Sequence, residues 1–285
     1  MDNITKKTIN FRGQVVKLDR PIVMGILNVT PDSFYDGGRY TYEEAIVKRA
    51  REILDQGATI IDVGAYSTRP GAADVPEKEE MNRLSKALSV IRDNFPDAII
   101  SVDTFRPSVA DFVLREFQVQ MINDIMGGGE DMRMFEVIAR WNVPYVLMHI
   151  QGTPQTMQKN PHYDDVVQEI VLYFAERLHR LRGLHVNDVL LDPGFGFGKT
   201  LEHNYQLLAH LDIFKKLFDE PLLVGVSRKS MIFRLLGITP EEALNGTTVV
   251  NTIALMKGAD ILRVHDVSQA VEAIKIVEKM REIEK

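Results

Sequence analysis

The 285-residue chain is 45% hydrophobic and 26% charged, the balance of a globular protein rather than a disordered one. It has no cysteine, which excludes structural disulfides, thiolate zinc sites and a cysteine nucleophile. The net charge of −6, from 34 basic and 40 acidic residues, lacks the basic excess of a nucleic-acid-binding protein.

No stretch approaches the roughly 18 uninterrupted apolar residues of a membrane helix. The start of the chain, Met1–Arg12, carries charges and has no continuous apolar core, so it does not read as a secretory signal. The sequence therefore predicts a cytoplasmic protein that binds neither nucleic acid nor membranes.

The first predicted element is a β-hairpin over Thr8–Asp19, in which Arg12-Gly13 lies between alternating apolar residues. Short apolar runs follow, each with Val, Ile or Leu on successive residues, as in strands buried on both faces. There are eight runs: Ile22–Leu27, Thr59–Val63, Ala98–Val102, Gln120–Ile122, Tyr145–Met148, Val189–Leu191, Leu222–Val226 and Asp260–Val264.

Longer segments with apolar residues at helical spacing separate these runs. They include Tyr42–Gln56, Glu77–Asn94, Pro107–Phe117, Met132–Trp141, Asp164–Arg182 and Val267–Met280. Pro107 suits the first turn of a helix, and we expect the pair Glu79-Glu80 to lie on a solvated helix surface.

Strands that alternate with helices pair in parallel through right-handed crossovers, and eight such units close a barrel of about 250 residues. The sequence predicts an α/β fold, a (β/α)8 TIM barrel with an N-terminal β-hairpin, as a single domain over residues 1–285. An open, doubly wound sheet is the structural alternative.

The active site of such a barrel lies at the carboxyl ends of its strands, where this chain places polar residues. Asp103 and Asp192 close their strands, and we interpret both as functional. Asp124 and Asp266 each lie beside a stronger candidate, and we interpret them as turn or cap formers. His149 is at least as well explained as a hydrogen-bonded structural histidine.

The glycine-rich run Gly194–Thr200 follows the sixth strand but matches no nucleotide motif. A P-loop would need glycine at Pro193, and a dinucleotide fingerprint would need glycine at Lys199. We interpret the run as a loop over the barrel mouth that lets a ligand approach closely.

The loops after the seventh and eighth strands predict an anion site, because barrels commonly bind phosphate there. These loops hold Ser227, Arg228, Lys229, Ser230, Arg263 and His265. Arg263 and His265 are two residues apart on a strand, so their side chains leave it on the same face. No tight metal site is predicted, but Asn28 could be the protein ligand of a Mg²⁺ held mainly by substrate phosphates.

Together these strand ends resemble those of the dihydropteroate synthase family over nearly the whole chain. The motifs that carry the resemblance are Met24–Phe34 (MGILNVTPDSF), Ser67–Ala72 (STRPGA), Leu190–Lys199 (LLDPGFGFGK), Gly225–Ser230 (GVSRKS) and Ile261–Val267 (ILRVHDV). The resemblance implies condensation of 6-hydroxymethyl-7,8-dihydropterin diphosphate with 4-aminobenzoate, giving 7,8-dihydropteroate and pyrophosphate in folate biosynthesis.

The resemblance also implies residue roles. The pterin would be held by Asp103, Asn123, Met148, Asp192 and Lys229. The diphosphate would be held by Asn28, Thr68, Arg263 and His265, with Mg²⁺ bridging Asn28 to it. The 4-aminobenzoate pocket would contain Phe34, Thr68, Arg69, Pro70, Phe197, Lys229 and Ser230. Catalytic roles would fall to Asp103, Lys229 and Asn28.

The implied mechanism is dissociative, in that pyrophosphate leaves first and the neutral amine then attacks the pterin cation. The resemblance further implies a homodimer and competition by sulfonamides. The chain departs from the family pattern at one point, since it has Ala65-Tyr66 where many members carry Gly-Glu.

Two other functions remain open on the sequence alone. A methyltransferase that passes a methyl group from methyltetrahydrofolate to a corrinoid protein would share the Asp and Asn residues that contact the pterin. It would not need Arg263, His265 and Lys229 around an anion. A catalytically silent paralogue is the second alternative, and only Tyr66 motivates it.

Overall fold

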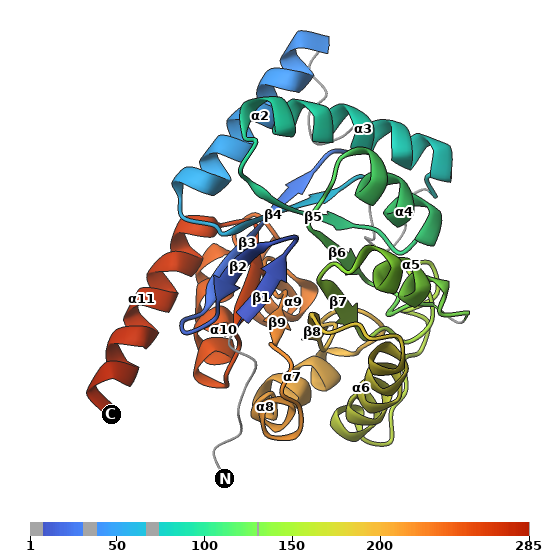
Figure 1. Cartoon of the computed structure of the whole chain (residues 1–285). Helices are drawn as coiled ribbons and strands as arrows, with labels where there is room; N and C mark the ends of the chain where they lie inside the picture. Colours follow the sequence, from blue (N-terminus) through green and yellow to red (C-terminus); the bar gives the residue numbers. More distant parts are fainter. Residues whose placement is uncertain (1–7, 31–38, 67–73, 130, 285) are drawn as a thin grey trace.

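The computed structural model describes residues 8–30, 39–66, 74–129 and 131–284. Within these ranges the chain forms an eight-stranded parallel sheet with helices outside it (Figure 1). The strands are β3 (Ile22–Asn28), β4 (Ile60–Gly64), β5 (Ile99–Asp103), β6 (Met121–Asp124), β7 (Tyr145–Met148), β8 (Val189–Asp192), β9 (Leu223–Val224) and β10 (Ile261–Val264).

The sheet curls round on itself, with strand order β8-β7-β6-β5-β4-β3-β10-β9. A parallel bridge between Leu191 and Leu222 joins its two ends, so β8 and β9 are neighbours. The (β/α)8 barrel prediction is confirmed, and the open doubly wound alternative was wrong.

Six helices agree with the predicted segments to within a few residues: α2 (Arg39–Asp55), α3 (Glu77–Asn94), α4 (Pro107–Glu116), α5 (Arg133–Trp141), α6 (Val166–Gly183) and α11 (Val267–Glu284). Four more lie between β8 and β10: α7 (Leu201–Ala209), α8 (Asp212–Leu217), α9 (Ser230–Leu236) and α10 (Leu244–Met256). Asp165 caps α6 by accepting hydrogen bonds from the backbone N–H groups of Val167 and Gln168.

The predicted hairpin is present as β1 (Thr8–Phe11) and β2 (Gln14–Lys17). Figure 1 shows it across the amino-terminal end of the barrel. There Ile9, Phe11 and Leu18 pack into a cluster with the first inward residues of the barrel strands. The hairpin therefore closes one end of the barrel with apolar side chains and leaves the other end to its loops.

The inward-facing side chains change character along the strands. On β4 and β5 the first inward residues, Ile60 and Ile99, belong to the apolar cluster under the hairpin. The next inward pair is Asp62 and Ser101, which are register partners on the two strands. The barrel interior is thus apolar at its amino-terminal end and polar towards the mouth, meaning the carboxyl ends of the strands and the loops after them.

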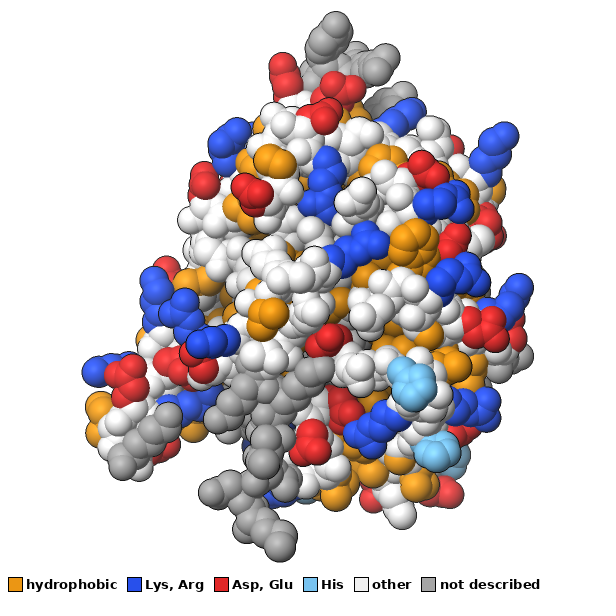
Figure 2. Space-filling view, viewed as in Figure 1, with side chains coloured by type: hydrophobic (Ala, Val, Ile, Leu, Met, Phe, Trp, Pro, Cys, Tyr) orange, Lys and Arg blue, Asp and Glu red, His pale blue; other side chains and the backbone are white. Residues whose placement is uncertain are grey.

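Basic and acidic side chains are interspersed on the face shown in Figure 2, without a large patch of one sign. None of the helices that the structure describes is long and apolar enough to span a membrane.

Candidate active site

Three predicted site residues and one glycine stand in one row across the mouth. Asn28, Gly64, Asp103 and Asn123 are successive register partners on β3, β4, β5 and β6. A side chain at Gly64 would begin 3.4 Å from the Asn28 Oδ1 and 3.5 Å from the Asp103 Cβ. The missing side chain therefore leaves space beside the Asn28 oxygen and the Asp103 carboxylate.

A buried carboxylate, Asp62, joins the two halves of this row. The Arg263 guanidinium donates from Nε to Asp62 Oδ2 (2.7 Å) and from Nη2 to Asp103 Oδ2 (2.6 Å). The Asn123 amide donates to the same Asp62 oxygen at 3.0 Å. Asp62 thus orients Arg263, from the predicted diphosphate site, and Asn123, from the predicted pterin site.

Sequence reasoning did not select Asp62 as a site residue. In the sequence, Asp62 stands out as a charged residue inside the otherwise apolar run Thr59–Val63. The residues directly before and after it are buried. Such a residue needs a partner within the protein, because an isolated buried charge is very costly. The partner, Arg263, lies 201 positions away in the chain, so the sequence could not show it.

The charges in this cluster shift each other's pKa values. Burial raises the pKa of Asp103 to about 7, against the opposing effect of Arg263 and with a further increase from Asp62. The pKa of Arg263 is also raised, because Asp62 and Asp103 outweigh the effect of its burial. Arg263 therefore stays a cation, and Asp103 has a pKa well above that of an ordinary carboxyl.

Asp192 and Lys229 form the opposite side of the mouth. Asp192 ends β8 as a buried carboxylate whose Oδ1 accepts a hydrogen bond from the Gly194 N–H at 2.8 Å. Burial raises its pKa, and Lys229 and that hydrogen bond oppose the rise. A side chain at Gly225 would begin 3.8 Å from Asp192 Oδ2 and 3.8 Å from the Arg263 Cβ, so this glycine leaves space between them.

The Lys229 ammonium donates to the Phe195 carbonyl at 2.5 Å and lies 4.6 Å from the centre of the Phe197 ring. Burial lowers its pKa to about 8, although Asp192 favours its charged form. The structure therefore brings Lys229, Phe197 and Asp192 together, three residues that the sequence assigned to the two substrate pockets.

Lys199 is a second lysine at the mouth and is buried, and sequence reasoning gave it no role in the site. Its Nζ contacts His149 Nδ1 (3.0 Å) and the carbonyls of Gly194 (2.9 Å) and Phe197 (3.0 Å). Lys229 also donates to the Phe195 carbonyl, and Gln158 donates to the Gly196 carbonyl. Side chains therefore hold four successive carbonyls of the glycine-rich loop, those of residues 194–197.

Gly194 allows this loop to pack against the preceding one. Its φ is +72°, and a Cβ there would collide with the carbonyl oxygen of His149. Burial lowers the pKa of His149 well below its usual value, with Lys199 adding to the effect. His149 is therefore a buried, neutral histidine that contacts Lys199 and packs edge-on against Tyr173. This is the structural role that the sequence left open for it.

Met148 ends β7 and is buried in a small apolar cluster with Ile125, Ile150 and Met157. We call this group the Met148 cluster. Phe197 packs against it and is itself only partly buried. The mouth therefore offers an apolar surface close to the polar groups of Asp192 and Lys229.

The cations of the last two loops do not all face the mouth. Arg228 donates two hydrogen bonds of 2.9 Å to the Asp266 carboxylate and reaches the carbonyls of Pro240 and Glu241. The backbone of His265 is held by the Ser227 hydroxyl and by Arg49. Arg228 and Asp266 form a structural ion pair, whereas Arg263 and Lys229 are turned towards the site.

Asp124 is a turn former, as predicted. It accepts hydrogen bonds from the Met126 and Gly128 N–H groups and from the Tyr145 hydroxyl. The interpretation of Glu80 as solvated surface was wrong, because its side chain is fully buried and accepts hydrogen bonds from Thr104 (2.7 Å) and Arg106 (2.6 Å).

Ser230 is the first residue of α9, directly after Lys229, and is partly buried. Four other predicted site residues lie outside the described residues: Phe34, Thr68, Arg69 and Pro70.

No group of three or more His, Asp or Glu side chains among the described residues could hold a metal ion. A Mg²⁺ bound mainly through substrate phosphates needs only one or two protein oxygens. The Asn28 oxygen beside Gly64 and Asp103 fits that need.

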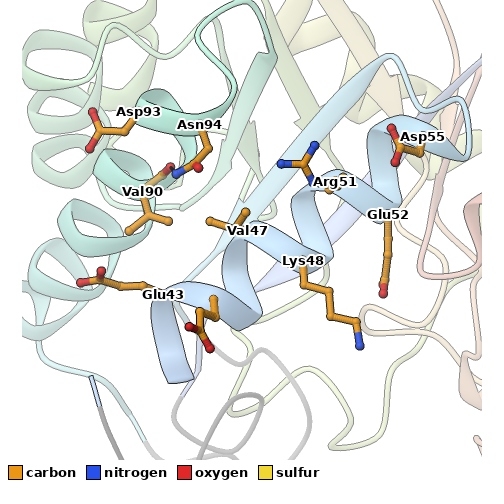
Figure 3. Close-up of a pocket in the computed structure, with 10 residues that line it drawn as sticks. Glu43, Val47, Lys48, Arg51, Glu52, Asp55, Val90, Asp93 and Asn94 are labelled. Atoms are coloured by element: carbon orange, nitrogen blue, oxygen red, sulfur yellow. Dashed lines mark hydrogen bonds between the residues drawn. The ribbon is translucent and has the colours of Figure 1, made fainter. Parts of the chain in front are cut away.

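A groove elsewhere on the protein has none of these features. It lies on the outer flank between α2 and α3, where Val47, Arg51, Val90 and Asn94 line it with several carboxylates (Figure 3). It contains no predicted site residue, and its charged side chains belong to the exposed faces of two helices.

Polar groups from six strands thus surround the end of a closed barrel, with the cations Arg263 and Lys229, three carboxylates and an apolar wall. The fold and this site define a pterin-binding barrel enzyme, and residues 24–265 match the family model described as "Pterin binding enzyme".

Within that class, the chain is 48% identical to dihydropteroate synthase of Escherichia coli K12 over 272 residues, covering 94% of each chain. It is 40% identical to dihydropteroate synthase of Bacillus subtilis, covering 92% of this chain and 89% of that one. The chain belongs to the dihydropteroate synthases, which are transferases of folate biosynthesis.

Solved structures agree with this assignment. A Yersinia pestis dihydropteroate synthase with a sulfonamide drug complex is 44% identical, covers 96% of this chain and 99% of that one, and superimposes with a TM-score of 0.88. A Xanthomonas albilineans dihydropteroate synthase with 4-aminobenzoic acid is 39% identical, covers 97% and 99%, and superimposes with a TM-score of 0.87.

Proposed function

We propose that the mouth of this barrel binds 6-hydroxymethyl-7,8-dihydropterin diphosphate and joins its methylene carbon to the amine of 4-aminobenzoate. The carbon–oxygen bond to the diphosphate breaks, a carbon–nitrogen bond forms, and the amine loses one proton. The observation that carries the proposal is the convergence of Asp192, Lys229, Asn123 and Arg263 at one end of the barrel.

The proposed pterin site lies between Asp192 and Asn123. A pterin presents a ring N–H beside an amino group, and one carboxylate can accept from both in a fork geometry. Asp192 suits this role because its carboxylate is buried and next to Lys229, which favours its ionised form. Lys229 would donate to the acceptors of the pterin, and Met148 would pack against the ring.

The proposed diphosphate site contains Arg263, His265, Asn28 and Thr68. Cations at the leaving group stabilise the negative charge that develops as pyrophosphate departs. Asn28 would hold Mg²⁺ together with the diphosphate oxygens, and the ion would supply further charge stabilisation at the leaving group. Because Asp62 and Asp103 orient the Arg263 guanidinium, it needs no reorganisation when the diphosphate binds.

Asp103 would stabilise the positive charge that develops on the reduced ring. Burial raises its pKa to about 7, so a nearby cation would shift it towards the ionised form needed for that role. The amine of 4-aminobenzoate is already unprotonated at neutral pH, so no strong base is required. The proposed arylamine pocket contains Phe34, Thr68, Arg69, Pro70, Phe197, Lys229 and Ser230.

A turnover assay with purified protein tests this proposal. With both substrates and Mg²⁺, pyrophosphate and dihydropteroate should form in equal amounts, and omission of 4-aminobenzoate or Mg²⁺ should stop product formation. Sulfonamides should compete with the amine. A protein that binds the pterin diphosphate but forms no dihydropteroate contradicts the proposal.

We also propose that the enzyme is a cytoplasmic homodimer. Exposed apolar side chains on α10, namely Val249, Ile253 and Met256, recur at helical spacing and support a subunit contact there. Ile253→Glu should give monomers in analytical ultracentrifugation, whereas a wild-type protein that sediments as a monomer contradicts the dimer.

A further inference from the structure

Tyr66 joins three loops of the mouth. Its hydroxyl donates to Asp74 Oδ1 (3.1 Å) and accepts from Gln155 Nε2 (2.8 Å). Its ring packs edge-on against Phe105 with 5.2 Å between centroids. Tyr66 follows β4, Phe105 follows β5, and Gln155 lies in the connection from β7 to α6.

An ion pair between Arg106 and the buried Glu80 supports this junction. The Arg106 guanidinium lies 5.3 Å from the centres of both the Tyr66 and Phe105 rings. It also donates to the buried Glu80 at 2.6 Å and to Asp74 at 3.4 Å. Glu80 on α3 therefore anchors Arg106, and Arg106 holds the two rings together.

The same junction leads to the apolar surface of the mouth. Phe105 packs against the Met148 cluster, and Met157 of that cluster lies two residues after Gln155 in a turn closed by Thr153 and Thr156. Phe197, beside Lys229, packs against the same cluster. A displacement of Tyr66 would thus move Phe105 and the turn that carries Met157.

We propose that Tyr66 is a positioning residue for the aromatic amine. Through its hydroxyl bond to Gln155 and its ring contact with Phe105, it sets the place of the apolar wall formed by Phe105, Met157 and Phe197. This role rests on the proposed function, because the arylamine ring is the ligand that this wall would contact. Among the described contacts, Tyr66 touches neither Asp192 nor Arg263 and reaches Met148 only through Phe105, so we expect its main effect on the arylamine and little effect on the pterin diphosphate.

The test compares Tyr66→Phe, Gln155→Leu and the double variant in steady-state kinetics. Tyr66→Phe keeps the ring and removes the hydroxyl with its bonds to Asp74 and Gln155. We expect a KM for 4-aminobenzoate about three- to tenfold higher, the effect of losing the bond to Gln155. Gln155→Leu should give the same increase, and the double variant no more than either single one. Tyr66→Ala, which also removes the contact with Phe105, should raise KM further.

Three readouts separate positioning from general structural damage. The kcat at saturating amine, the Kd for the pterin diphosphate and the melting temperature should stay within error in Tyr66→Phe. Gln168→Leu, on the exposed side of α6, is the matched control and should leave every constant unchanged.

Equal KM values for wild type, Tyr66→Phe and Tyr66→Ala overturn the role of Tyr66 alone. The role is also overturned if KM rises equally for both substrates and the melting temperature falls. It is overturned too if the increases in KM add in the double variant. A wild-type enzyme without turnover overturns the proposed function and, with it, this role.

Discussion

At the amino-terminal end of the barrel, the inward side chains include Met24, Ile60 and Ile99, and the hairpin covers them with Ile9 and Phe11. Two residues further along β4 and β5, the inward side chains are Asp62 and Ser101, and the strands end at Gly64 and Asp103. The same strands therefore form a dry, closed core at one end and a polar, open site at the other.

This difference separates stability from chemistry along a single axis. Apolar side chains under the hairpin stabilise the barrel by removing their surface from water. The carboxylates and cations of the mouth are costly to bury and are retained in a mutually paired arrangement. Substitutions at the two ends should consequently have different signatures, and the following predictions use that contrast.

The largest effect is expected for Asp192→Asn at the mouth. The amide would present donor N–H groups to the donors of the pterin, so two charge-assisted hydrogen bonds of about 1.5–3 kcal/mol each are lost or replaced by repulsion. We expect kcat/KM for the pterin diphosphate to fall about 100- to 1,000-fold. Asp93→Asn, at an exposed position of α3, is the control, and similar constants for both variants would contradict the site.

Phe11→Ala at the closed end should have the opposite signature. Phe11 is fully buried under the barrel, and its truncation should lower the free energy of unfolding by about 3–5 kcal/mol in urea titrations. The KM for each substrate should not change. Val15→Ala, at an exposed position of the same hairpin, should have little effect on either quantity. Altered KM values in Phe11→Ala would show that the two ends are not separate.

Asp62→Asn lies at the boundary between the two regions and should affect both. It weakens the bond to Arg263 and disturbs Asn123, while Arg263 keeps Asp103 as a partner. We expect a loss of about 2 kcal/mol in stability, less than for a fully broken buried pair, and about a tenfold fall in kcat/KM. Unchanged kinetics with reduced stability would assign Asp62 to the core instead of the site.

The smallest predicted effect is a pH dependence of substrate binding. Lys229 is cationic below its pKa of about 8 and neutral above it, so affinity for the anionic pterin diphosphate should fall several-fold between pH 7 and pH 9.5. Lys229→Arg keeps its charge over this range and should give a flatter profile by calorimetry. Identical profiles for the two proteins would exclude Lys229 as the titrating group.

The sequence was sufficient for the barrel because strand bodies and helices carry local periodic signals. Glu77–Asn94 was predicted with the bounds that α3 has, and all eight strands were located to within a few residues. The strand ends also supplied the candidate site residues, since Asp103, Asn123 and Asp192 follow their runs directly and Arg263 lies near the end of the last run. These signals need no knowledge of long-range contacts.

The remaining features depend on partners far apart in the chain. Glu80 looked like a solvated residue because it lies in a charged helical turn, but Arg106 and Thr104 bury it. Lys199 and Asp62 likewise take their roles from contacts with His149 and Arg263. Pairings of this kind arise from strand order and loop packing, which hydrophobic periodicity does not encode.

The division of the mouth into a pterin side and a diphosphate side can be tested directly with two ligands and two variants. Calorimetry should show that Asp192→Ala loses affinity for a pterin but retains that for pyrophosphate with Mg²⁺. Arg263→Ala should show the reverse. Equal losses of pyrophosphate affinity in the two variants would contradict the account.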